Sequence, residues 1–148
     1  MSKICLPPVD SRDRAKTMVL SLQDEICTGL ELLDGKGKFY EETWERPEGG
    51  GGRSRVLQEG NILEQGGVNF SEVYGKFSKE FRNKVPGANK NPNFWATGIS
   101  VVLHMKNPHV PAMHFNTRYI QTSYGWFGGG MDSTPCFKAV SYTHLTLP

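Results

Sequence analysis

The stretch from Gly98 to Asp132 limits the possible folds more than any other part of this chain. It begins within an apolar run, Phe94 to His104, and continues through the turn Met105 to Pro111 into a second run, Ala112 to Thr122. Runs rich in β-branched and aromatic residues favour strands, and a short turn makes two successive strands antiparallel. Similar segments precede this stretch, so we expect an antiparallel meander.

Four earlier segments also have the pattern of strands. They are Phe39 to Trp44, Arg55 to Glu59, Ile62 to Gln65 and Val68 to Tyr74. Gly60 and Asn61 are expected to form the turn of a hairpin. Residues 76–92 are polar and contain two prolines, so we expect a loop there with at most one helical turn.

One amphipathic helix is expected before the strands. Between Ala15 and Leu33, apolar residues recur at steps of three and four, and Asp10 or Ser11 can cap the first turn. Gly35 then provides the residue type at which helices commonly end. Such a helix buries its apolar side against a sheet, which predicts an α+β fold with a large antiparallel β-sheet flanked by helical layers.

Composition excludes several classes of protein. A chain of 148 residues can form one domain, its net charge of +2 is too small to indicate nucleic-acid binding, and no stretch is apolar enough to cross a membrane. Cys5, Cys27 and Cys136 have no CxxC spacing, which favours free thiols in a reducing compartment. We therefore expect a soluble, cytoplasmic protein with a disordered leader at residues 1–10.

The histidines provide the first indication of chemistry. His104, His109 and His114 lie five residues apart, and Asn116 and Arg118 would share one strand face with His114. An imidazole, an amide and a fixed cation together suit an anionic ligand that exchanges protons. The alternative is a structural strand with a solvated polar face. The joint spacing of the three residues favours the ligand site.

A glycine run, Gly49 to Gly52, precedes Arg53 and Arg55. It is not a phosphate-binding P-loop, because the Gly-Lys-Ser/Thr ending is missing. Two arginines on one strand face beside a mobile loop can clamp carboxylates. They can equally keep a strand edge soluble, and the residues alone leave both readings open.

Four motifs, in this order, resemble oxygen-dependent coproporphyrinogen III oxidase: GGGGRSRVL, EQGGVNFS, GISVVLHMKNPHVPAMHFNTRY and WFGGGMDSTP. The resemblance covers about residues 11–138. It implies an enzyme of porphyrin and haem biosynthesis that converts two propionates of coproporphyrinogen III to vinyl groups, giving protoporphyrinogen IX. Dioxygen is the co-substrate, no organic redox cofactor is implied, and family members are homodimers with a sheet between helical layers.

The resemblance also implies roles for particular residues. His114 matches the proposed proton donor, and substrate contacts fall on Ser100, Asn116, Thr117 and Arg118, to which we add Arg53 and Arg55 as cations for the propionates. A divalent metal, as in bacterial members, would use His104 and His114, although His104 can equally be a hydrogen-bonded neighbour. Adjacent glycines would let the backbone lie against a flat macrocycle.

The end of the chain departs from the family pattern. The family continues for about as many residues again after WFGGGMDSTP, Ser133 replaces a usual leucine or valine, and residues 139–148 look like a non-family tail. We therefore expect a truncated, N-terminal part of the family domain that is inactive alone. The alternative function is a non-catalytic, carboxylate- or tetrapyrrole-binding β-sheet module.

Overall fold

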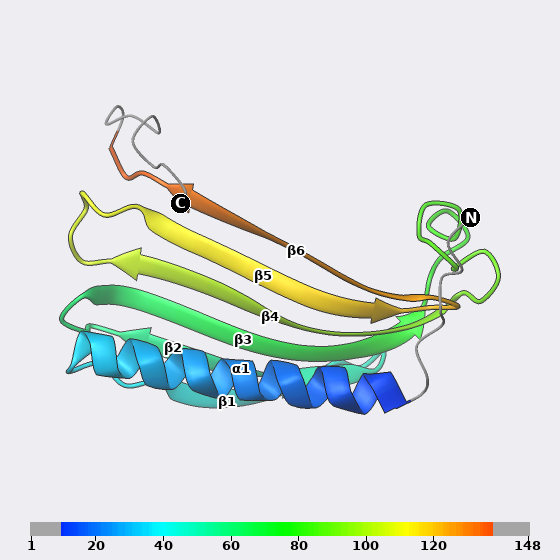
Figure 1. The fold of residues 1–148 in the computed structure, drawn as a ribbon, viewed down its shortest axis with the longest axis horizontal. Coiled ribbons are helices and arrows are strands. Elements are labelled where there is room, and N and C mark those ends of the chain that lie inside the picture. Colours follow the sequence, from blue (N-terminus) through cyan, green and yellow to red (C-terminus); the bar gives the residue numbers. More distant parts are fainter. Residues whose placement is uncertain (1–9, 138–148) are drawn as a thin grey trace.

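The computed structural model describes residues 10–137, which form one long helix and one six-stranded sheet (Figure 1). The elements are α1 (Asp10–Asp34), β1 (Tyr40–Glu45), β2 (Gly50–Gln58), β3 (Leu63–Lys76), β4 (Asn93–Met105), β5 (Ala112–Gln121) and β6 (Gly125–Thr134). The strands follow one another across the sheet in chain order, and every neighbouring pair is antiparallel. The predicted meander is confirmed.

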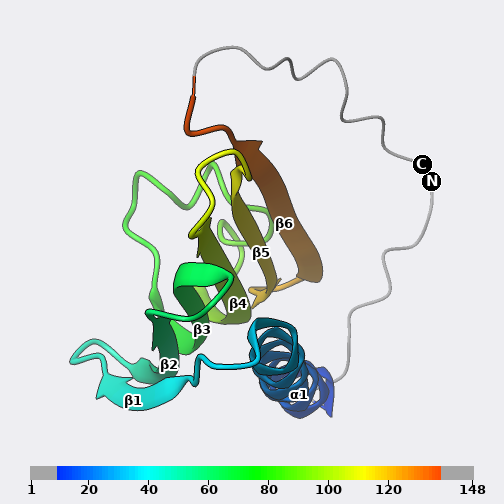
Figure 2. The same cartoon turned by 90° about the vertical axis from the view of Figure 1, so that its left-hand side faces the viewer.

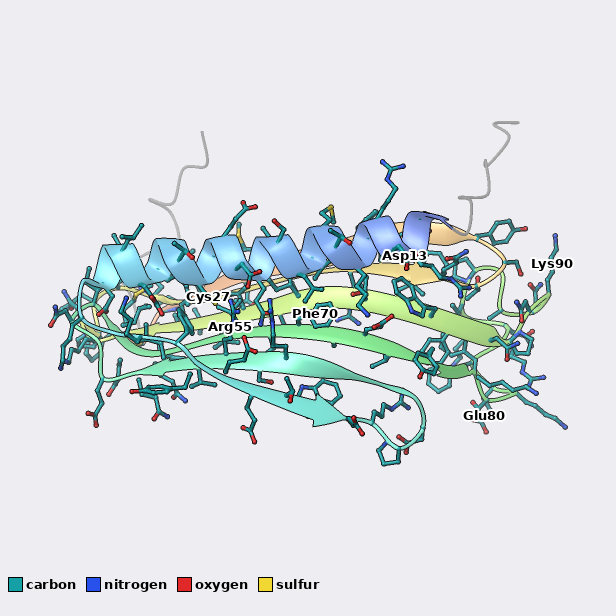
Figure 3. The ribbon with its side chains drawn as sticks, turned by 90° about the horizontal axis from the view of Figure 1, so that it is seen from below. Asp13, Cys27, Arg55, Phe70, Glu80 and Lys90 are labelled. Carbon is teal, nitrogen blue, oxygen red and sulfur yellow. The ribbon has the colours of Figure 1, made fainter. Side chains whose placement is uncertain are left out.

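Helix α1 lies along one face of the sheet, where it packs mainly on β3 and β4 (Figure 2). Before its last turn, its buried side chains recur at every fourth residue and belong to Ala15, Val19, Gln23 and Cys27. The strands contribute Val68, Phe70, Ile99 and Val101 to the same core. Figure 3 shows Cys27 and Phe70 in the layer between the helix and the strands. The predicted packing of the helix on the sheet is therefore confirmed.

The buried side of α1 has a polar residue at its centre, which the apolar periodicity did not predict. Met18 and Leu33 belong to the apolar residues that recur between Ala15 and Leu33, but they are 47% and 63% exposed, whereas Gln23 is fully buried. The Gln23 amide donates to the main-chain carbonyls of Val68 (2.7 Å) and Arg53 (2.8 Å), and it accepts from Arg53 Nε (2.7 Å). Burial of a polar group costs little free energy when the group keeps its hydrogen bonds, so hydrophobicity alone does not predict that Gln23 is buried.

The helix ends where the sequence predicted. Gly35 has a positive φ of 74°, and its N–H donates to the Glu31 carbonyl at 3.0 Å. The last helical residue, Asp34, is buried. Its carboxylate accepts from the main-chain N–H groups of Gly37 (2.7 Å), Ile62 (2.8 Å), Asn61 (2.9 Å) and Leu63 (2.9 Å). The carboxylate thus fastens the end of α1 to the turn between β2 and β3.

The hairpin made by β2 and β3 is confirmed, with Gln58 opposite Gln65. In the turn, the positive φ falls on Glu59 and not on Gly60. Gly60 is required for another reason: a Cβ there would collide with the Asp34 carboxylate. The two segments 62–65 and 68–74 are one continuous strand, β3.

The prediction of a mobile loop at Gly49 to Gly52 is wrong. Strand β2 begins at Gly50, and the following glycines pair with β1 and β3. Gly49 and Gly50 have positive φ values of 122° and 99°, which favour glycine. At Gly52 a Cβ would meet the Trp44 ring. The run therefore serves a tight turn and close strand packing.

Residues 1–9 and 138–148 lie outside the described residues, and with them Cys5, most of the expected leader and the expected tail; Asp10 belongs to α1. Residues 77–92 contain turns but no assigned helix. Cys27 and Cys136 are free thiols. Within residues 10–137, no helix is long and apolar enough to cross a membrane.

The expected helical layers are found in part. Helix α1 covers one face of the sheet, whereas no helix of the described chain covers the other (Figure 2). On β4 this leaves Ser100 exposed between the buried Ile99 and Val101, so the strand is covered on one side only. We call the side turned away from α1 the open face.

Candidate functional site

The register of β4 and β5 brings four of the predicted site residues together on the open face. Ser100 is directly opposite Asn116, and Arg118 and His114 lie two residues to either side of Asn116 on β5. Side chains alternate along a strand, and Tyr119, the residue after Arg118, is buried against Ala15 of α1. Ser100, His114, Asn116 and Arg118 therefore project together, away from the helix.

His114 has two neighbours on adjacent strands. Its Nδ1 lies 2.7 Å from Oδ1 of Asp132 on β6, and its ring centre lies 6.3 Å from that of His104 on β4. The His114 side chain is 40% exposed, so its ring remains accessible from solvent. An imidazole with one ring nitrogen occupied by a carboxylate can still exchange a proton through the other.

The polar groups beside His114 are available for a ligand. Within the described part of the chain, the side chains of Ser100, Asn116 and Arg118 make no hydrogen bond or ion pair. Arg118 lies between Gly98 on β4 and Gly128 on β6, and Asn116 is opposite Gly130. A guanidinium and an amide thus stand beside positions without side chains, where a flat ligand can approach the backbone.

The other three predicted substrate contacts lie on the helix side of the sheet. Thr117 follows Asn116 on β5 and points the other way; its Oγ1 lies 3.5 Å from the Gly128 carbonyl oxygen. Arg53 and Arg55 share a strand face, as predicted, but this face is turned toward α1. The structure does not bring these three residues together with His114.

Both arginines are already paired with carboxylates of this chain. Asp24 on α1 contacts Arg53 Nη2 at 2.8 Å and Arg55 Nη1 at 2.6 Å, and Glu41 on β1 contacts Arg55 Nε at 2.8 Å. Burial disfavours the charge of Arg55, but hydrogen bonds to Glu41, Cys27 and Asp24 outweigh this effect and raise its pKa. Figure 3 shows Arg55 beside Cys27 beneath the helix. The pair joins α1, β1 and β2.

The expected metal ligands do not complete a site. His104 and His114 face each other with their rings at 74°, and Asp132 is joined to His114. Residues 10–137 contain no group of three or more His, Cys, Asp or Glu side chains placed to hold a metal ion. His109 instead packs on Phe137, with ring centres 5.3 Å apart. Two imidazoles without a further ligand do not fit a closed metal centre.

Asp132 is the residue that sequence reasoning missed at this site. Its contact with His114 depends on the pairing of β5 with β6, which no local motif reveals. One signal was present, because Gln121 and Gly125 are paired at the turn between these strands. His114 lies seven residues before Gln121, and Asp132 lies seven residues after Gly125, so antiparallel pairing puts them opposite each other. A correct turn assignment at residues 122–124 would therefore have predicted the pair.

Comparisons with known proteins agree on one family. The family model described as "Coproporphyrinogen III oxidase" matches residues 14–144. The protein named "Oxygen-dependent coproporphyrinogen-III oxidase" from Synechococcus sp. (strain CC9902) is 58% identical over 134 residues, which are 89% of this chain and 37% of that protein. The protein of the same name from Prochlorococcus marinus (strain NATL1A) is 57% identical over 143 residues, 95% of this chain and 41% of that protein.

These matches extend over almost all of the chain, but the chain spans only 37–41% of the length of these two relatives. All four open-face residues lie inside the matched range, which also reaches into residues 139–148. Residues 138–148 lie outside the described structure.

Proposed function

This chain belongs to the coproporphyrinogen III oxidase family, and we propose that its open face forms one side of the site where the whole protein oxidises coproporphyrinogen III. In the proposed reaction, a propionate, one dioxygen and one proton give a vinyl group, carbon dioxide and hydrogen peroxide. Two propionates react in this way and yield protoporphyrinogen IX. The observation that carries the proposal is the gathering of His114, Asn116, Arg118 and Ser100 on that face.

Arg118 and Asn116 are assigned to the substrate carboxylates. A propionate that leaves water needs a charged or hydrogen-bonding partner, because an unpaired carboxylate in a dry site is strongly unfavourable. The Arg118 guanidinium can bind both oxygens of one carboxylate, and the neighbouring amide and the Ser100 hydroxyl can donate to the same group or to the next. All three side chains lack partners within the described chain, which supports this assignment.

His114 is assigned to proton transfer. Each conversion takes up one proton, and loss of a proton from the pyrrole makes the ring a better reductant for dioxygen. A histidine gains and loses protons near neutral pH, and such assistance is typically worth ~10²–10⁴-fold in rate. Its position on β5, two residues from Asn116, supports this role, because a carboxylate held by Asn116 would lie close to the imidazole.

The proposal includes the surroundings of the site. The family resemblance supports a homodimer in the cytoplasm and a second helical layer over the open face. Such a layer would exclude water from the substrate and strengthen the electrostatic contacts there. Thr117, Arg53 and Arg55 are not assigned to the substrate, because they lie on the other side of the sheet.

The test uses a chimera in which this chain replaces the matched segment of the full-length Synechococcus relative. We expect the chimera to convert coproporphyrinogen III. Arg118→Ala should raise KM by ~10-fold or more, because a charged hydrogen bond is worth ~1.5–3 kcal/mol. Arg118→Lys should restore part of the affinity, since an ammonium lacks the planar two-pronged contact. His114→Ala should instead lower kcat and leave KM nearly unchanged.

Arg14→Ala is the matched control, because Arg14 is exposed on α1 at the other face of the sheet. The proposal is contradicted if Arg118→Ala behaves like this control, or if His114→Ala retains full turnover. A chimera that binds coproporphyrin III without turning over the reduced substrate would favour the non-catalytic binding module.

A further inference from the structure

We propose that Asp132 is a positioning residue that holds the His114 ring in one orientation and one tautomer for proton transfer. The inference rests on the proton-transfer role of His114 in the proposed function. Asp132 occupies the β6 position directly opposite His114, and its Oδ1 lies 2.7 Å from Nδ1 of the imidazole. This distance is that of a strong, charge-assisted hydrogen bond.

The contact determines which ring nitrogen faces the ligand. A carboxylate only accepts hydrogen bonds, so the neutral His114 ring carries its proton on Nδ1. Nε2 then has a free lone pair and remains available to take a proton. The other tautomer would place a lone pair against the carboxylate, which is repulsive. A carboxylate is used in the same way to orient histidines in hydrolase triads.

Neighbours on both sides limit the movement of the ring. His104 on β4 packs edge-on at 6.3 Å from the side opposite β6. Asp132 is itself near the Thr134 hydroxyl, whose Oγ1 lies 3.5 Å from Oδ1. The imidazole is thus held between side chains of the two adjacent strands.

We expect the contact to contribute little to folding, which allows a clean test. The side chains of His114 and Asp132 are 40% and 66% exposed, and exposed pairs of this kind contribute little to stability. Removal of the carboxylate should therefore free the imidazole without unfolding the sheet. A merely structural pair would show the opposite pattern: a change in stability without a change in tautomer or turnover.

The experiment uses the chimera described above with ¹⁵N-labelled histidine. Long-range ¹H–¹⁵N spectra show which ring nitrogen carries the proton, and the signal lost in His114→Gln assigns His114. We expect an Nδ1-protonated ring in the unchanged protein and a mixture with the Nε2-protonated form in Asp132→Ala. Asp132→Asn should fall between them or reverse the preference, because an amide can both accept and donate.

Kinetics on the same variants complete the test. Asp132→Ala should lower kcat by ~10–100-fold, the usual cost of losing an orienting partner, with KM nearly unchanged. Asp13→Ala is the control, because Asp13 is an exposed carboxylate on α1 (Figure 3). An unchanged tautomer in Asp132→Ala, or a changed tautomer with full kcat, overturns the positioning role. Full turnover in His114→Gln instead removes the proton-transfer role itself, and the positioning role with it.

Discussion

Two neighbouring glycines on β6 differ in what surrounds them. At Gly129, on the helix side, a Cβ would collide with the Asn116 carbonyl, so this position must be glycine for close strand packing. At Gly128, on the open face, a Cβ would have no protein atom within 4 Å. Glycine in an exposed strand position weakens the strand. Nothing within the described chain requires it there, and a ligand lying beside Arg118 supplies a reason.

This contrast leads to a prediction for Gly128→Val in the chimera. The added side chain would not collide with the protein, but it would fill the space beside Arg118 where we place the ligand. KM for coproporphyrinogen III should therefore rise by ~10-fold or more, equivalent to ~1.4 kcal/mol. Thermal stability should hold or increase, because β-branched residues favour strands. Steady-state kinetics and thermal unfolding measure both effects.

Gly29→Ala serves as the control for that variant. Gly29 is exposed on α1, and a Cβ there also meets nothing within 4 Å, but it lies on the opposite side of the sheet. It should stabilise the helix and leave KM unchanged. If Gly128→Val keeps a normal KM, the ligand does not lie beside Arg118.

Residue-level reasoning from sequence succeeded only for neighbours along one strand. Because side chains alternate, the shared face of His114, Asn116 and Arg118 could be predicted from spacing alone. The positions of Asp132 and of the two arginines on β2 could not, since they depend on strand register and on which face receives the helix. Arg53 and Arg55 share a face as predicted, yet on that face they form ion pairs with Asp24 and Glu41.

At the scale of elements, the end of α1 and the turn between β2 and β3 depend on one carboxylate. Main-chain hydrogen bonds to the Asp34 carboxylate, of which the one from Leu63 has the largest effect, lower its pKa. They outweigh burial, which raises the pKa, and hold it far below its ordinary range. The folded state therefore favours the charged form more than the unfolded state does. This contribution to stability is fully present above about pH 4, the ordinary carboxyl pKa, and it is lost as pH falls further.

We accordingly predict that Asp34→Asn lowers the free energy of unfolding at pH 7. An amide has one acceptor oxygen in place of two, and its NH₂ group opposes the main-chain N–H donors. The difference from the unchanged protein should shrink as pH falls below about 4, because the carboxylate is then being protonated. Urea unfolding of the chimera at pH 7, 5 and 3 tests this expectation. Asp13→Asn is the matched control, and an equal effect of both variants would contradict the assignment.

Helices and strands with a regular spacing of apolar residues could be predicted from the sequence. Segments whose structure depends on contacts with distant parts of the chain could not. The span of α1 and the strands β4 and β5 match their predicted ranges within two residues, because apolar periodicity and turn residues act locally. The prediction of a mobile loop for the glycine run at the start of β2 is wrong, because these glycines accommodate the Trp44 ring and the β3 backbone. Those contacts come from elsewhere in the fold.

At the scale of the whole molecule, α1 is too narrow to cover its side of the sheet. It packs on β3 and β4, and the helix-side residues of β5 and β6 remain exposed, namely Met113, Phe115, Phe127 and Met131. A groove of about 1070 Å³ runs between α1 and these strands. Tyr119 lines this groove, and its hydroxyl is buried without a hydrogen-bond partner in the described chain. Apolar patches of this kind usually form contacts with other protein surfaces.

We therefore predict that the isolated 148-residue chain self-associates through this patch. Phe127 is 53% exposed and Met131 is 67% exposed. Replacing both by lysine should shift the chain toward monomer in sedimentation velocity, because each charge would have to be desolvated at the contact. The fold should persist, since neither side chain belongs to the core. Phe81→Lys alters a residue that is 54% exposed in the loop 77–92 and should leave association unchanged. If the unchanged chain sediments as a monomer, or if the double variant associates as strongly as the unchanged chain, this face of β5 and β6 does not drive association.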